Sequence, residues 1–583
     1  MKRILIICLL FPTIFFAQYW GERTTEQSFE QSDLFFKSHF LNTFGVKYFK
    51  DISVGMIDDP FLNLQLNPAN TPDLGNKEIY VYLDFRGDRT EEAIIENYAA
   101  PVYDALSSYA PPIDRRWHSE TRTEPEPLVS LGMLTYPIES LSKKFYVGGT
   151  YQLLLKEESF YSMPIGIYNS QYYYDSFGRE AHVKDSYHIT DHHMGSDEMI
   201  NEGHLYSAFA GYNFNDDLKI GLSINGVAHS RQGNHSNSFR SEYYNIEDQW
   251  SNSDFTQRNQ DYSHLDINTG IIYNLTSNFS SGIKFGVLSG NIDQNYIQEY
   301  SYFSQQNTPE ESPEWNLHAS NSSTVQNWNH DGNTYYFRVH FTRKLKGDNE
   351  ASGFYRYGYS DINTSNHSVI DDTTYYSNRW NNETHYGSSS VLDIRNGLGY
   401  RNRSAHEAML NFKWLLSEKS MLTAGVYFNS NKTKIFTSEP VTVNRYSSYD
   451  QDNIQRLYED KELSWEHESS EWSLQIPILF NFEFNEYFSM MIGLNRIFES
   501  WNITDVTTAL FNERVRTENG EETKHTNFGE RYFQPDRGIT EDHTDIVTRF
   551  SAKPSDALKI SLLLDPQFEN SFRIAQWWLS FEA

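Results

Sequence analysis

Apolar and polar residues alternate most regularly between Asn333 and Ser360. Because successive side chains of a β-strand point to opposite faces, this alternation predicts two strands that share an aromatic and apolar face. That face would carry Tyr335, Phe337, Val339 and Phe341, and then Tyr355, Tyr357 and Tyr359. A polar turn at 346–349 separates the two halves, so the stretch predicts a β-hairpin.

The same unit recurs along the chain, from a first strand at 79–85 to a last strand that contains Trp577, Leu579 and Phe581. Short turns join the two strands of each predicted pair, whereas long connections rich in Asn, Ser, Asp and Tyr separate one pair from the next. Alternation of short turns with long loops, on strands of about ten residues, is typical of outer-membrane barrels. Closure is expected because lipid cannot satisfy an open sheet edge.

The sequence therefore predicts an all-β fold, namely a closed antiparallel transmembrane β-barrel of about 14 to 16 strands with long extracellular loops. Residues 77–583 would form the barrel. An even number of strands would place both of its ends in the periplasm. The alternative is a secreted soluble sandwich or propeller, but the repeated blades and even loop lengths of a propeller are not evident.

The composition and the first residues of the chain indicate where the protein is located. Aromatic residues make up 16% of the chain although the mean hydropathy is -0.64, which suits polar loops on aromatic strands better than disorder. Residues 1–17 have a basic start and an apolar stretch, so they are predicted to be a secretory signal peptide. Cys8, the only cysteine, lies within it, which predicts a mature chain without disulfides. The net charge of -30 argues against a nucleic-acid partner.

Residues 18–76 come before the first strand and are predicted to be a periplasmic or plug segment. They contain Asp58-Asp59 and then Asn67, Pro68 and Ala69. This arrangement resembles the FadL-like outer-membrane transporters, in which an N-terminal hatch carries an Asn-Pro-Ala motif just before the first strand. The resemblance implies a plugged barrel that passes hydrophobic molecules, typically long-chain fatty acids. The aromatic, Asn-rich style and the Phe-Phe-Ala-Gln cleavage site also resemble outer-membrane proteins of Bacteroidetes.

Candidate ligand contacts lie on the polar face of the first hairpin, at Arg338, His340 and Arg356. The turn makes the two arginines approximate cross-strand neighbours. Like charges directly opposite each other are destabilising, so a compensating anion is expected. It would be either a ligand group selected by the lumen or a carboxylate of the protein, such as Glu483.

Other polar clusters are weaker candidates. His188, His192 and His193 lie among acidic residues, but the spacing is unspecific and a solvated stretch is the simpler interpretation, so no metal site is predicted. Acidic pairs such as Asp371-Asp372 and Glu521-Glu522 are read as hydrated, with cation binding at the lipopolysaccharide surface as the alternative. The sequence contains no nucleophile motif or phosphate loop, so neither catalytic residues nor a cofactor are predicted.

The predicted function is a channel or transporter for hydrophobic or small molecules in the outer membrane of a Gram-negative bacterium. Its expected partners are outer-membrane lipid, lipopolysaccharide and a hydrophobic small-molecule ligand. The alternative is a surface-exposed binding or adhesion protein, or a structural barrel whose lumen is blocked.

Overall fold

The structure is a computed structural model. It describes residues 55–57, 59–72, 74, 79–88, 128–137, 144–159, 166–169, 172–174, 180–182, 187–194, 198–243, 248–307, 315–347, 349–380, 383–450, 453–533, 537–555, 557–567 and 573–583. The predicted signal peptide, most of the segment 18–76, Asp58 and Asp348 lie outside the described residues. No helix in the described part of the chain is long and apolar enough to cross a membrane.

Sixteen antiparallel strands close into one barrel, which confirms the predicted fold class. The wall follows chain order and closes where the last strand pairs with the first. Its strands are β1 (Ile79–Asp88), β2 (Val129–Thr135), β3 (Phe145–Ser159), β8 (Glu198–Asn213), β9 (Leu218–Tyr243), β10 (Asp248–Thr276), β11 (Phe279–Asn307), β12 (Trp315–Lys344), β13 (Glu350–Trp380), β14 (Glu383–Ser417), β15 (Ser420–Tyr449), β16 (Asn453–Glu483), β17 (Phe488–Glu518), β19 (Arg537–Ser555), β20 (Leu558–Gln567) and β21 (Arg573–Glu582).

The strands differ greatly in length. β12 to β17 contain 30, 31, 35, 30, 31 and 31 residues, whereas β1, β20 and β21 contain 10 each. A strand of 30 residues is about 100 Å long, far more than a bilayer core of roughly 30 Å requires. The polar connections that the sequence analysis read as loops are therefore largely continuations of the strands.

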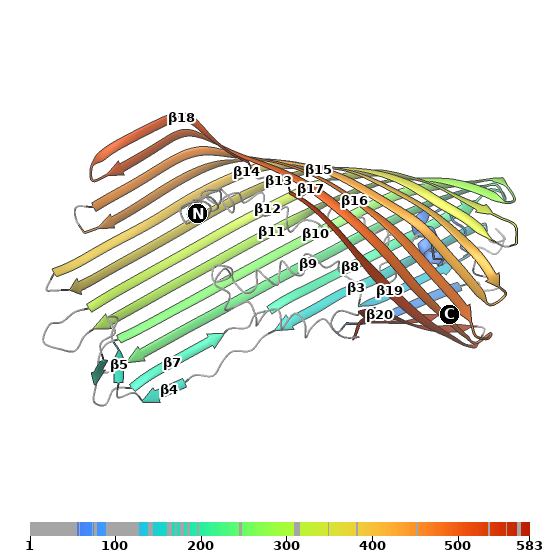
Figure 1. Ribbon diagram of the computed structural model, residues 1–583, viewed down its shortest axis with the longest axis horizontal. Helices are drawn as coiled ribbons and strands as arrows, with labels where there is room; N and C mark the ends of the chain where they lie inside the picture. The colour runs from blue at the N-terminus through green and yellow to red at the C-terminus, as the bar shows by residue number, and fades with distance from the viewer. Residues whose placement is uncertain are drawn as a thin grey trace, which may run out of the picture.

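The long strands form a curved wall that extends well beyond the short ones, and we call this extension the half-shell (Figure 1). At its borders, β4 (Gly166–Asn169) pairs with β7 (Tyr187–Met194), β7 pairs with β9, and β18 (Glu521–Phe533) pairs with β17. A separate two-stranded sheet is formed by β5 (Tyr172–Tyr174) and β6 (Glu180–His182). The short turns and the C-terminus lie together at the opposite end, which we call the short-turn end (Figure 1).

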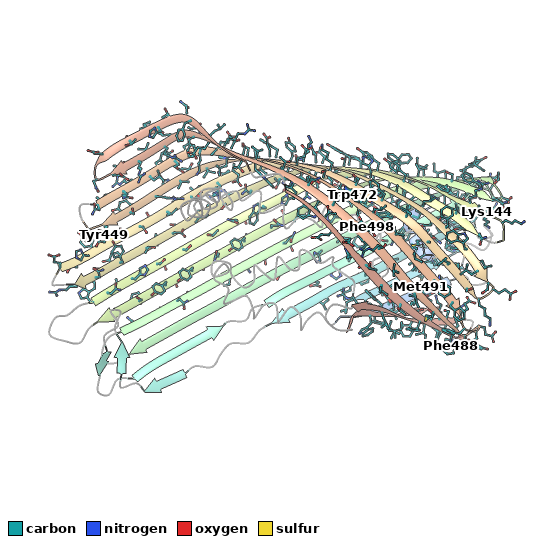
Figure 2. The ribbon with its side chains drawn as sticks, in the orientation of Figure 1. Lys144, Tyr449, Trp472, Phe488, Met491 and Phe498 are labelled. Atoms are coloured by element: carbon teal, nitrogen blue, oxygen red, sulfur yellow. The ribbon has the colours of Figure 1, made fainter. Side chains whose placement is uncertain are left out.

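An apolar belt surrounds the barrel near the short-turn end. Each of the sixteen barrel strands contributes at least one exposed large hydrophobic side chain, for example Val81, Met133, Tyr151, Tyr206, Leu222, Ile267, Phe285, Tyr335, Tyr355, Leu410, Val426, Trp472, Ile492, Phe550, Leu562 and Trp577. Figure 2 places Phe488 at the short-turn end, Trp472 and Phe498 part-way along the wall, and Tyr449 at the far end of the half-shell. So extensive an apolar surface is suited to contact with the hydrocarbon of a membrane.

The hairpin with which the sequence analysis began has the predicted faces and register. Val339 is 40% exposed on the belt, whereas Arg338 is 5% exposed and points to the interior. Arg338 lies directly opposite Arg356 across the β12–β13 pair. Gly347 has a φ of 75°, a conformation that glycine adopts without strain, and this allows the tight turn.

Candidate functional site

A short helix, α4 (Pro60–Leu66), is packed inside the short-turn end of the barrel. Asp59 caps it by accepting hydrogen bonds from the backbone N–H groups of Phe61 and Leu62, at 2.9 and 3.1 Å. Pro60 follows the cap, where its missing N–H costs nothing. The helix ends at Asn67, because a residue before proline disfavours the helical conformation. We call residues 59–72 the plug.

The plug fills the width of the barrel with an apolar layer. Phe61, Leu62 and Leu64 are fully buried. Twelve of the sixteen strands point an apolar side chain into the same cluster: Tyr80 and Tyr82, Leu134, Tyr146, Phe209, Phe354, Met409, Tyr427, Leu479, Met491, Val547, Leu563 and Trp578. The plug and this ring of wall residues, which we call the apolar ring, form one continuous core.

The remaining quarter of the wall, β9 to β12, meets the Asn-Pro-Ala motif. A Cβ atom on Gly270 would lie 1.8 Å from Asn67 Oδ1, and one on Gly221 would lie 2.0 Å from the Pro68 carbonyl oxygen. Real Cβ atoms do not approach other atoms so closely, so a side chain at either position would displace the motif. The motif therefore rests directly on the backbone of β9 and β10.

Hydrogen bonds fix the orientation of the Asn67 amide. Its Nδ2 donates to the carbonyl oxygens of Ile271 and Ile283, at 3.3 and 3.1 Å. Its Oδ1 accepts from the backbone N–H of Ala69 at 2.9 Å. Nδ2 also lies 3.0 Å from His340 Nε2, which accepts in this pair because Nδ2 is a donor, so the three acceptors share the two hydrogens of the amide. Asn67 thus joins the plug to three neighbouring strands.

A row of charged residues crosses the same part of the wall. Lys284, Arg338, Arg356 and Glu407 lie directly opposite one another on β11, β12, β13 and β14. Lys284 Nζ donates to the Gln65 carbonyl oxygen at 2.8 Å, and Arg338 Nη1 lies 3.4 Å from the same oxygen. Gln65 is in the last turn of α4, where the carbonyl groups lack helical partners and carry partial negative charge.

At the end of the row, Arg356 forms an ion pair with the carboxylate of Glu407. Its Nη1 is 2.8 Å from Glu407 Oε1, and both side chains are at most 10% exposed. The carboxylate beside Arg356 is therefore Glu407 and not Glu483, which lies exposed at the end of β16. The compensating groups for both arginines are protein atoms: the plug carbonyl for Arg338 and Glu407 for Arg356.

Comparison with known proteins gives no family. No protein-family model matches the chain, and no curated protein matches its sequence. A solved FadL homologue from Pseudomonas aeruginosa is 12% identical, with 75% of this chain and 89% of that one covered and a TM-score of 0.24. P. aeruginosa FpvA bound to heterologous pyoverdines is 7% identical, with coverage of 86% and 71% and a TM-score of 0.23. The copper transporter OprC is 7% identical, with coverage of 86% and 80% and a TM-score of 0.21. These similarities are too low to assign a function.

The other candidate residues of the sequence analysis lie on strands far from the plug. His188, His192 and His193 are on β7, which pairs with β9. Asp371 and Asp372 are within β13, opposite Ser323 and Ser322. Glu521 and Glu522 begin β18. Asp197, one of the acidic residues near these histidines in the sequence, lies outside the described residues, and no group of three His, Cys, Asp or Glu residues suited to a metal ion occurs in the described part of the chain.

Sequence reasoning missed α4, Lys284 and Glu407. The helix had a usable signal, since Asp59-Pro60 is a good cap and first turn and Asn67-Pro68 is a stop. Lys284 and Glu407 had none. In the sequence, each is separated from its arginine by a long polar stretch that does not mark the position of the turn, so the pairing register could not be inferred.

Replacing Asn67 with alanine is expected to loosen the plug while the wall stays folded. The substitution removes the donors to Ile271 and Ile283, so we expect the free energy of local plug opening to fall by about 1–3 kcal/mol. Hydrogen exchange of the amides in 60–70 measures this directly. Asn70→Ala is the matched control, because Asn70 Nδ2 donates within the plug, to the Asn63 carbonyl oxygen. Equal exchange in the two variants would contradict the role assigned to Asn67.

Proposed function

We propose that this chain is an outer-membrane channel or transporter for hydrophobic or small molecules, and that the plug is its gate. The observation that carries the proposal is the apolar ring around the plug. When the plug leaves its seat, it uncovers residues from twelve strands, among them Phe209, Phe354 and Met491. A passage lined in this way favours apolar solutes over strongly hydrated ones.

The structure of the seat supports movement of the plug as a unit. The plug is held by side-chain contacts and by hydrogen bonds such as Lys284 to Gln65, and none of its described residues forms a strand with the wall. Breaking such contacts does not require breaking the barrel ladder. We propose that the short-turn end faces the periplasm and that the half-shell extends outside the cell.

Uptake into proteoliposomes tests the proposal. Vesicles that contain the purified protein are expected to take up a labelled long-chain fatty acid faster than empty vesicles, with arabinose as the hydrophilic comparison. A barrel that passes neither solute would overturn the proposed function.

A second candidate function is surface binding with a permanently seated plug. The half-shell favours it, because transport across a membrane does not by itself require strands about 100 Å long. Uptake indistinguishable from empty vesicles, together with retained binding of a partner to the half-shell, would favour this candidate.

A further inference from the structure

The outer face of the barrel carries an unusual polar surface just beyond the apolar belt. On β10 to β13, fifteen outward positions are seven Asn, four Asp, three Ser and one His, with neither Lys nor Arg. We call these residues the Asn/Asp band: Asn259, Asp261, Ser263, Ser289, Asn291, Asp293, Asn295, Asn327, Asn329, Asp331, Asn333, Asp361, Asn363, Ser365 and His367. They point outward because the residues between them, such as Ile292 and Ile362, are buried.

The band is organised by hydrogen bonds across the strands. Asn329 donates to Asp293, and Asn291 donates to the other oxygen of the same carboxylate at 3.0 Å. Asn295 donates to Asn327, which lies directly opposite it. These bonds hold amide and carboxylate groups in fixed positions, with other lone pairs and N–H groups directed to the outside.

The surface of the band also contains a cavity. A cavity of about 500 Å³ opens over β10 to β13 and is lined mainly by band residues, among them Asp261, Asp293, Asn295, Asn327 and His367. Its size and its many donors and acceptors suit one or two hydroxyl-rich sugar rings.

A second hollow lies on the same strands, within the apolar belt. It has a volume of about 650 Å³ and is lined mainly by apolar side chains, among them Ile267, Phe285, Val287, Tyr335 and Phe337. Val287 and Asp293 are six positions apart on β11, which is roughly 20 Å along the strand. The apolar hollow therefore lies at the level of acyl chains, and the polar hollow lies in the direction of the lipid headgroup and beyond.

We propose that these two hollows bind one lipopolysaccharide molecule of the surrounding outer leaflet, with an acyl chain in the lower hollow and core sugars in the upper one. The band meets sugar hydroxyls rather than bare phosphates, because its four carboxylates repel anions and it has no Lys or Arg. The proposal rests on the proposed outer-membrane location and is independent of transport.

The outer face of β15 to β19, farther round the wall, has a different chemistry. There, Lys432 and Lys434 pair with Glu468, and Arg496 pairs with Asp542. The charges of these side chains are neutralised by ion pairs with one another, whereas the band presents ordered amide groups to the outside. The assigned lipid site lies on β10–β13 and the adjoining β9.

Lipid titration of the purified barrel in detergent tests the site. The probes are rough-type lipopolysaccharide, lipid A without core sugars, and phosphatidylglycerol, with bound lipid counted by native mass spectrometry. The sugar-contact variant is Asn295→Ala with Asn327→Ala. Its matched control is Ser470→Ala with Asn502→Ala, a directly opposed, outward pair on β16 and β17 outside the band. Val287→Trp fills the apolar hollow.

We expect the wild type to prefer rough-type lipopolysaccharide to lipid A, and the band variant to lose about tenfold in affinity for the former only. Val287→Trp is expected to weaken both lipids, and the control pair neither. Equal affinity for lipopolysaccharide and lipid A would overturn the sugar site, and so would equal losses in the band and control variants. If the barrel transported normally but gave one of these two binding results, the lipid site would be refuted and the proposed transport function would still stand.

Discussion

Replacing Gly270 with alanine is expected to lift the plug from its seat and to open the barrel. The new Cβ would lie 1.8 Å from Asn67 Oδ1 and 2.9 Å from Pro68 Cδ, so the motif has to move. Overpacking of this kind costs about 1–3 kcal/mol, which raises the population of the unseated plug by roughly five- to 150-fold. The conductance of single barrels in a planar bilayer reports this population as the fraction of time spent open.

Gly358→Ala is the control for this experiment. Gly358 also faces the interior, but the nearest atom to its new Cβ is Tyr336 Cβ at 3.8 Å, an ordinary contact. This variant is expected to conduct like the wild type. If Gly270→Ala also conducted like the wild type while remaining folded, the plug would not close the pathway.

Replacing Glu407 with glutamine is expected to produce the largest loss of stability. It leaves the Arg356 guanidinium in the interior without the carboxylate that now lies 2.8 Å away. Breaking a buried ion pair by removing one partner costs about 3–5 kcal/mol. Urea titration of the folded fraction, followed by heat-modifiable migration on gels, measures this change.

The double variant Arg356→Met, Glu407→Leu separates loss of the ion pair from the cost of a buried Arg356 charge without its carboxylate. Replacing both charges with apolar groups is often neutral or stabilising, so the double variant is expected to be more stable than Glu407→Gln alone. A Glu407→Gln protein within about 1 kcal/mol of the wild type would show that the pair is not essential to the wall.

The sequence predicted those parts of the fold that local rules determine. Strand faces follow from a period of two, and the short turn at 346–349 fixes the register that places Arg338 opposite Arg356. The Asn-Pro-Ala motif comes before the first strand, but the wall residues that it contacts were not predictable from the sequence. Gly221 and Gly270 are distant in sequence, and only the closed barrel brings them beneath the motif.

The half-shell could not be predicted because its sequence has a polar outer face. Alternation of apolar and polar residues marks a strand only where one face is covered by lipid or core. In the Asn/Asp band the apolar–polar alternation is weak. The strand propensity is weak as well, since Asn and Asp are depleted in ordinary strands and favour turns. The high Asn and Asp content that made these strands hard to predict also forms the polar surface proposed to bind core sugars.

Tying the plug to the wall tests the central claim that passage requires the plug to leave its seat. Thr71 Oγ1 donates to Asn213 Oδ1 at 2.8 Å, so cysteines at these two positions can be joined by a short cleavable crosslinker. The only native cysteine, Cys8, lies in the predicted signal peptide. Each single-cysteine variant treated with the same reagent is the control. We expect fatty-acid uptake into proteoliposomes to stop when the linker is closed and to return when it is cleaved. Uptake at the same rate with the plug tied would contradict the account.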